Sequence, residues 1–208
     1  MSRKITDIQP QKKREGYYSI FLDGEYTFSL SELDLSIAGL HIEEEINEDR
    51  LLELQKLSQQ SKIYSRALYY LRFGPRTVWQ MREYLVRKVG FDEEEVVAVL
   101  QKLENDKFLN DETYIESYVS SRQIFRPRSK RQLSNELRKK GINAKLIDES
   151  LRMLDDDSQR AAAEQIIRKK LLLPRFQDKQ KLTEYMLRQG FPYSLVKEVI
   201  TEVSLETS

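Results

Sequence analysis

Three glycines spaced about fifty residues apart head the same short pattern, and this predicts a chain built from tandem repeats. Gly90, Gly141 and Gly190 are separated by 51 and then 49 residues. In each copy, apolar side chains occupy the positions one, six, ten and thirteen residues after the glycine. The last three offsets step by four and three, which places those side chains on one face of an α-helix. The residues concerned are Phe91, Val96, Leu100 and Leu103; Ile142, Ile147, Leu151 and Leu154; and Phe191, Val196, Ile200 and Val203.

The pattern extends into the segment before each glycine. Leu133 and Leu137 lie eight and four residues before the second glycine, and Leu182 and Met186 hold the same places in the third copy. In the first copy the equivalent residues lie nine and five positions before the glycine, so the segment 86–89 carries one extra residue. We expect each glycine to end its helix in a left-handed conformation that a Cβ atom would disfavour.

Capping residues predict where the other helices begin. Asp92 and Asn143 stand two residues after their glycines and are good N-caps, while Pro192 fits the start of the corresponding helix in the third copy. Thr77 and Ser129 each precede a glutamine by three residues, which is the spacing of a capping box. The segment before the second helix of each copy contains a proline, which cannot continue a helix with its hydrogen bonds intact. They are Pro75, Pro127 and Pro174.

Each copy is therefore predicted to contain three helices. Repeats of about 45 residues are too short for a large core of their own, so neighbouring copies should share apolar surface. We expect a mainly α fold of tandem three-helix repeats that forms an elongated, curved solenoid. Two aromatic residues, Tyr69 and Trp79, fall off the apolar faces and are expected to be exposed or to lie between repeats. The predicted helices are 62–73, 77–89 and 92–106 in the repeat 62–109; 111–124, 129–140 and 143–154 in the repeat 110–156; and 158–172, 177–189 and 193–204 in the repeat 157–204.

Residues 1–61 differ from the repeats and predict a small β-hairpin element followed by a linking helix. The run Tyr17–Leu22 is aromatic and β-branched, and the Asp23-Gly24 pair after it is a strong two-residue hairpin turn. Ile5 and Ile8 mark a third strand, so the β-element covers residues 4–30. We further predict a short helix or turn over 31–40, closed by Gly39, and a helix over 48–60 that is capped by Asn47.

The composition excludes most catalytic and metal chemistry. The chain has no cysteine, and its one histidine, His41, has no neighbours at metal-ligand spacing. It contains neither a phosphate-binding loop nor a dinucleotide-binding glycine motif. We therefore predict a non-enzymatic protein without cofactor or metal. No signal peptide and no membrane-spanning run is recognisable, which predicts a cytoplasmic protein with no membrane partner.

Charge is divided unevenly along the chain. Residues 1–61 carry seven Lys/Arg and twelve Asp/Glu, whereas residues 62–203 carry twenty-eight and twenty-one. The densest basic stretch, residues 122–152, has ten basic side chains and three acidic ones. Such a surface suits a partner that bears phosphates or carboxylates. The candidate contact residues are Arg72, Arg76, Arg126, Arg128, Lys130, Arg131, Arg138, Lys139, Lys140, Arg168, Lys169, Lys170 and Arg175.

These cations also have a simpler interpretation, as solvated charges that favour the C-terminus of a helix. That interpretation explains Lys139 and Lys140 well. It explains the loop 125–131 poorly, because this loop combines an aromatic residue with four cations. Reading of a specific DNA sequence by a helix-turn-helix is disfavoured, since the third helix of the first copy begins with four acidic residues that would repel phosphates.

Several short motifs carry a resemblance to a known family. They are Ala67-Leu68-x-Tyr70-Leu71-Arg72 with Pro75-Arg76-Thr77; Leu100-x-x-Leu103 and Phe108-Leu109-Asn110-Asp111 with Tyr114 and Tyr118-Val119; and Leu137-Arg138-x-Lys140-Gly141-Ile142 with Ile147 and Leu151. In these motifs, from residue 62 to about 203, the chain resembles the RecX family, whose members regulate the RecA recombinase. The N-terminal hairpin is similar to the β-extension of longer members of that family.

The resemblance implies a cytoplasmic, non-enzymatic helical-repeat protein that binds the RecA–DNA filament along its groove. It implies restraint of filament growth, ATPase and strand exchange in recombination, DNA repair and the SOS response, with single- or double-stranded DNA as an additional contact. We expect the protein to be a monomer. Two alternatives stay open, a general nucleic-acid-binding protein that uses the basic second copy and a passive helical-repeat interaction scaffold.

Overall fold

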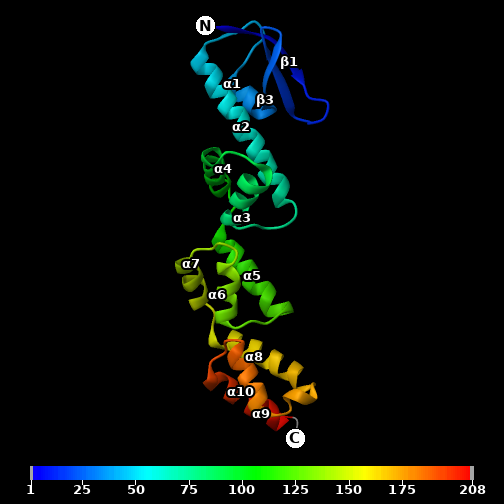
Figure 1. The fold of residues 1–208 in the computed structure, drawn as a ribbon, viewed down its shortest axis with the longest axis vertical. Helices are drawn as coiled ribbons and strands as arrows, with labels where there is room; N and C mark the ends of the chain where they lie inside the picture. The colour runs from blue at the N-terminus through cyan, green and yellow to red at the C-terminus, as the bar shows by residue number, and fades with distance from the viewer. Residues whose placement is uncertain (1, 207–208) are drawn as a thin grey trace. The chain divides into compact units, whose positions relative to one another are not determined.

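The structure is a computed structural model that describes residues 2–206, and the chain divides into two compact units. The first unit contains the residues up to Pro75 together with Met81–Phe108, and the second contains Arg76–Gln80 together with the chain from Leu109 onward. Helices dominate both units, and strands occur near the N-terminus (Figure 1). The prediction of a mainly α fold with tandem three-helix repeats and a small N-terminal β-element is confirmed.

The N-terminal element is a four-stranded antiparallel sheet. Its strands are β1 (Arg3–Pro10), β2 (Tyr17–Leu22), β3 (Glu25–Ser31) and β4 (Glu45–Ile46), in the order β3-β2-β1-β4. Asp23 and Gly24 both have positive φ angles, 51° and 85°, as a two-residue hairpin turn requires, so the predicted turn is confirmed. The strand β4 was not predicted, because two residues are too few to show an alternating pattern.

A helix of 24 residues, α2 (Glu48–Leu71), packs against this sheet. The side chain of Asn47 caps it by accepting a hydrogen bond from the backbone N–H of Arg50, as predicted. The prediction of two helices, 48–60 and 62–73, is wrong, because no glycine or proline interrupts the chain there and one helix runs through. Before it, the short helix α1 (Glu32–Ala38) ends at Gly39, as expected. The sheet core consists of Ile5, Ile20, Leu22, Phe28, Leu30, Leu40, Ile46 and Leu54.

The extra residue of the first copy is accommodated by a local change of helix type. The helix α3 (Val78–Glu83) continues as a π-helix, η1 (Tyr84–Val89), before the chain reaches α4 (Glu93–Asn105). A π-helix has a wider turn than an α-helix and so absorbs one additional residue. Met81 and Leu85 consequently remain fully buried although they lie one position farther from the glycine than their counterparts.

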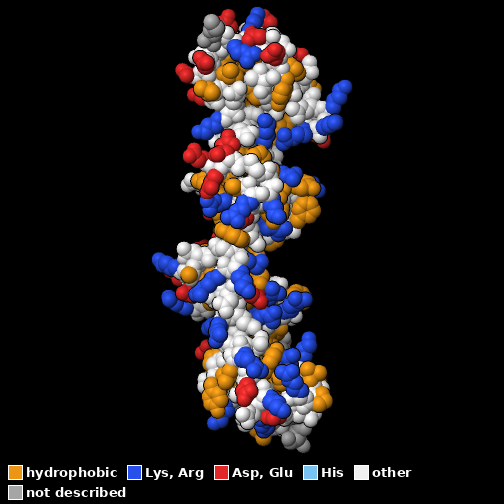
Figure 2. Space-filling view, in the orientation of Figure 1, with side chains coloured by type: hydrophobic (Ala, Val, Ile, Leu, Met, Phe, Trp, Pro, Cys, Tyr) orange, Lys and Arg blue, Asp and Glu red, His pale blue; other side chains and the backbone are white. Residues whose placement is uncertain are grey.

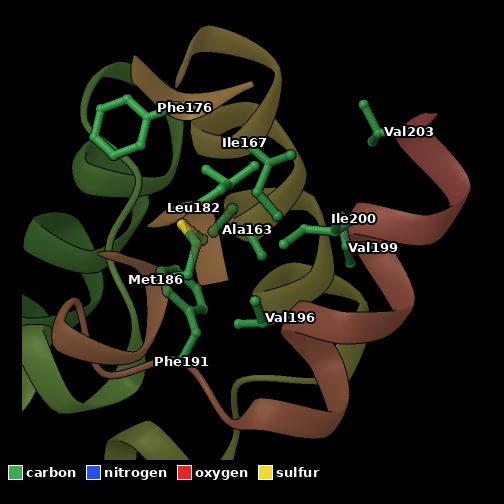
Figure 3. Packing of buried hydrophobic residues seen from close by; sticks show 11 residues of the cluster. Ala163, Ile167, Phe176, Leu182, Met186, Phe191, Val196, Val199, Ile200 and Val203 are labelled. Carbon is green, nitrogen blue, oxygen red and sulfur yellow. The ribbon is translucent and has the colours of Figure 1, made fainter. Parts of the chain in front are cut away.

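The second unit contains the two remaining three-helix repeats. They comprise α5 (Asp111–Phe125), α6 (Lys130–Arg138) and α7 (Ala144–Arg152), followed by α8 (Asp156–Leu171), the 3₁₀-helix η2 (Pro174–Phe176), α9 (Lys179–Arg188) and α10 (Tyr193–Glu206). Figure 3 shows how the core of the last repeat is formed by side chains that converge from these elements, among them Ile167, Leu182, Met186 and Val196. The apolar pattern after the glycines is buried as predicted, except that Phe91 and Leu154 are half-buried.

All three repeat glycines have the predicted left-handed conformation, with φ angles of 89°, 78° and 89°. Gly141 has a second requirement, because a Cβ atom built there would lie 2.2 Å from Cγ of Trp79. The indole ring thus packs on Gly141 and is still 43% exposed, as expected for an aromatic residue off the apolar face. A Cβ atom at Gly190 would likewise approach Oγ of Ser129 to 2.9 Å, whereas one at Gly90 would meet nothing within 4 Å.

Candidate partner-binding surface

The loop between α5 and α6 is held in place by one acidic side chain. Glu136 of α6 accepts a hydrogen bond of 2.9 Å from Nε of Arg128 and another of 2.9 Å from Nε of Arg122. The hydroxyl of Tyr118 donates a third, of 2.6 Å, to the same carboxylate. Arg128 was predicted from the sequence as a contact residue. In the structure it forms an ion pair with Glu136 that holds the loop.

The surroundings of Glu136 favour its ionised form. Burial raises the pKa of this carboxyl, but the hydrogen bonds from Tyr118 and Arg128 and the charges of Arg122 and Arg128 outweigh burial and lower it below its ordinary value. Burial and the hydrogen bond to Glu136 raise the pKa of the Tyr118 hydroxyl. The cluster consequently carries two guanidinium groups on one carboxylate at neutral pH.

Lys130 is also engaged inside the protein. Its Nζ atom donates a hydrogen bond of 2.6 Å to the backbone carbonyl of Leu154, just after α7. Its backbone N–H, in the first turn of α6, donates 2.9 Å to Oε1 of Gln159 on α8. The residue therefore joins α6 to α8 and to the segment between α7 and α8.

Four other candidate cations of the second repeat, Arg126, Arg131, Arg138 and Lys139, are exposed. Within residues 2–206 none of the four forms an ion pair or a side-chain hydrogen bond. Figure 2 shows Lys and Arg side chains gathered over the region of α5 and α6. These four side chains, here called the open cations, have no acidic partner among the residues that the structure describes.

Two lysines repeat one arrangement in successive copies. Nζ of Lys140 lies 5.7 Å and 5.2 Å from the ring centroids of Tyr114 and Tyr118. Nζ of Lys170 lies 5.4 Å from the ring of Phe176 and 4.9 Å from a second ring, that of a tyrosine on α9. Cation–π attraction of this kind orients both ammonium groups over aromatic pairs.

The remaining candidates have mixed environments. Nε of Arg168 donates a hydrogen bond of 2.8 Å to Glu164 one turn earlier in α8. The guanidinium of Arg175 lies 4.9 Å from the ring of Phe176. Of the others, Arg72 and Lys169 are exposed and Arg76 is half-buried.

A pocket of about 620 Å³ opens beside the start of α6 in the second unit. Its lining carries both signs of charge, with Lys130, Arg131 and Arg160 beside Asp156, Asp157 and Glu198. Arg160 is already paired with Glu198 at 2.9 Å. The pocket therefore lacks the uniform positive charge that a phosphate would favour, and we do not assign a ligand to it.

One set of surface residues was not predicted from the sequence, a large exposed apolar side chain at the end of the first helix of every copy. Phe73, Phe125 and Leu172 are 64%, 77% and 81% exposed. Each stands two residues before a proline that is followed by arginine. The motif apolar-x-Pro-Arg, repeated three times, was the signal that identifies them.

Neither a metal-binding cluster nor a membrane-spanning helix is found in the part of the chain that the structure describes. Within residues 2–206, no three histidine, aspartate or glutamate side chains are grouped so that they would hold a metal ion. Of the helices in the same part of the chain, none combines the length and the apolar character needed to cross a membrane.

Comparison with known protein families gives four matches that follow one another along the chain. Residues 3–47 match the domain described as "Regulatory protein RecX N-terminal domain". The first, second and third three-helix domains of RecX match residues 64–103, 110–151 and 156–200. The pattern found in the sequence and the repeats found in the structure thus fall on the same segments.

Individual proteins agree with these matches. The regulatory protein RecX of Limosilactobacillus reuteri is 31% identical over 211 residues, which cover 98% of this chain and 79% of that protein. The regulatory protein RecX of Bacillus licheniformis is 29% identical over 207 residues, covering 97% and 78%. A crystal structure of regulatory protein RecX superposes with a TM-score of 0.78 at 28% identity, over 96% of this chain and 99% of the other. The structure of RecX from Lactobacillus salivarius gives 0.63 at 26% identity, over 71% and 97%.

Proposed function

Because this chain belongs to the RecX family of regulatory proteins, we propose that it binds the RecA–DNA filament along its groove and restrains filament growth, ATP hydrolysis and strand exchange. The role is that of a binding protein without catalysis, since the chain has no cysteine and His41 is its one histidine. We place this activity in the cytoplasm, with the protein acting as a monomer in recombination and DNA repair.

The observation that carries the proposal is the set of open cations. Arg126, Arg131, Arg138 and Lys139 are exposed, and within the described residues no carboxylate neutralises them. A filament of protein on DNA offers phosphates and acidic side chains that would pair with such groups. By contrast, Arg128 belongs to the internal Glu136 cluster.

The difference between the open cations and Arg128 decides which residues to substitute. The double variant Arg126→Ser/Arg131→Ser should weaken binding to the RecA filament and reduce the dependence of affinity on salt, because fewer counterions are released. The matched control is Lys145→Ser, which removes an 85% exposed cation that already has Glu149 as a neighbour at 3.9 Å. Filament ATPase and strand exchange are then titrated with the wild-type chain and both variants.

The outcomes separate the proposal from its rivals. Unchanged ATPase and strand exchange in the presence of excess wild-type protein would contradict filament regulation. Equal affinity for naked single-stranded DNA and for the filament would favour a general nucleic-acid-binding protein, for which the same open cations are the supporting observation. Binding to the filament without any effect on its ATPase or strand exchange would favour the passive interaction scaffold.

A further inference from the structure

The first helix of every three-helix repeat ends in a small exposed apolar patch. In the first copy the rings of Tyr69 and Phe73 meet edge to face at 5.4 Å, and they are 46% and 64% exposed. In the second copy Ile124 and Phe125 are 68% and 77% exposed. In the third copy the two leucines that precede Pro174 are 81% and 47% exposed. We name these pairs the helix-end tips.

The backbone explains why these side chains stay in solvent. A proline two positions later cannot donate the helical hydrogen bond, so the helix stops. The residue directly before proline is driven toward an extended conformation. Arg126 and Leu173 show this, with φ and ψ of −149° and 76° and of −101° and 127°. The helix therefore ends beside the tip, and the tip side chains lie mostly in solvent.

An arginine accompanies each tip at the surface. Arg72, Arg126 and Arg175 are exposed and stand within three residues of an apolar tip side chain. Single exposed apolar residues are ordinary on protein surfaces. An exposed apolar pair beside an exposed arginine occurs in all three copies, although the side chains differ from copy to copy. Arginine, present at every tip, and the aromatic residues of the first two tips are enriched at protein interface hot spots.

We propose that each helix-end tip inserts its apolar side chains into a pocket on a protein partner, with a carboxylate at the rim of the pocket pairing with the arginine. Because the three tips share one chemistry, the partner presents the same pocket repeatedly, as the identical subunits of a polymer do. The inference rests on the proposed function and specifies its contact sites. A nucleic-acid strand is disfavoured, since Ile124 and the leucine pair at 172–173 offer no ring on which a base stacks.

The test uses the full chain and the RecA–DNA filament. Phe125→Ser and Leu172→Ser should each weaken filament binding on the order of tenfold while leaving thermal unfolding unchanged, because both side chains are mostly in solvent. The loss should be equal at low and high salt, unlike the loss caused by removing a cation. The control is Met153→Ser, which removes an 87% exposed apolar side chain at the end of α7, outside the tips.

A second pair of variants identifies the occupant. Phe125→Leu should bind almost as well as the wild-type chain, because an apolar protein pocket that accepts Leu172 accepts leucine here. If Phe125→Trp retains binding while Phe125→Leu loses it, the tip stacks on a base and the inference is overturned.

The remaining outcomes are equally decisive. If Met153→Ser weakens binding as much as the tip variants, or if the tip variants bind like the wild-type chain, the tips are not docking sites and the proposed function stands without them. If the wild-type chain does not bind the filament at all, the proposed function itself fails.

Discussion

The hydroxyl of Thr77 donates a hydrogen bond of 2.7 Å to the backbone carbonyl of Lys140, the residue immediately before Gly141. The same bond recurs one repeat later, where the hydroxyl of Ser129 donates 2.6 Å to the carbonyl of Gln189, immediately before Gly190. In each case an N-cap residue of one repeat binds the end of the second helix in the next. Both donors are fully buried.

A backbone hydrogen bond also recurs at both junctions. The N–H group after Thr77 donates 3.0 Å to the carboxylate of Asp111, as the N–H group after Ser129 does at 2.9 Å to the amide of Gln159. In the third repeat the equivalent N-cap residue is Asp178, which has no hydroxyl group. A carboxylate has no hydrogen to donate to a carbonyl, so this end of the second unit cannot form the same junction.

A substitution at Thr77 should show how strongly the junction is held. Thr77→Val keeps the shape but leaves the carbonyl of Lys140 and the N–H of Gln80 without a partner, and we expect it to lower the free energy of unfolding by about 2–3 kcal/mol. Thr77→Ser keeps the hydroxyl and should cost less than about 1 kcal/mol. Denaturant unfolding of both variants measures the difference, and equal costs would show that the hydroxyl is not the cause.

The repeat glycines should respond unequally to alanine. Gly90→Ala introduces only the strain of a positive φ angle, about 1 kcal/mol. Gly141→Ala adds a clash with the ring of Trp79, and we expect a total of about 2–4 kcal/mol. Unfolding curves for the two variants supply the comparison. A smaller loss at Gly141 than at Gly90 would refute the close packing of the indole.

The Glu136 cluster predicts a pH dependence of stability. The pKa of Glu136 is lowered in the folded chain, so its contribution is fully present above the ordinary value of 4.5 and is lost as the pH falls through the folded pKa. Glu136→Gln should therefore reduce the slope of stability against pH below about 4.5. Glu116→Gln, at an exposed position in the middle of α5, is the control and should change the slope less than Glu136→Gln does. Thermal unfolding from pH 3 to pH 7 tests this.

The π-helix should tolerate a deletion that an α-helix does not. Removing Lys88, which is exposed, restores the spacing of the other two copies, and we expect η1 to become α-helical with a change in stability within about 1 kcal/mol. Removing Arg138 instead shifts Leu133 and Leu137 relative to Gly141 and should cost about 3 kcal/mol or more. Denaturant unfolding measures the stability of both deletion variants, and circular dichroism measures their helix content. A destabilised Lys88 deletion would indicate that the wide turn is required by its surroundings.

The sequence by itself determined the repeat architecture, because burial follows local periodicity. Apolar offsets of four and three residues, the capping pair at Thr77 and the turn at Asp23 are set by residues close together in the chain, and each is confirmed. The extra residue before Gly90 was likewise visible in the sequence, although the π-helix that accommodates it was not.

Only the tertiary structure decided which charged residues are available for a partner. Composition treats Arg126 and Arg128 alike, yet the second is held by Glu136 at 2.9 Å and the first is open. The sequence pattern also explains a glycine at position 141 only by its φ angle. The structure adds that the ring of Trp79 lies against Gly141. Pairing and close packing depend on side chains brought together from different helices, and distances of that kind are fixed by the fold and are not encoded in any local pattern.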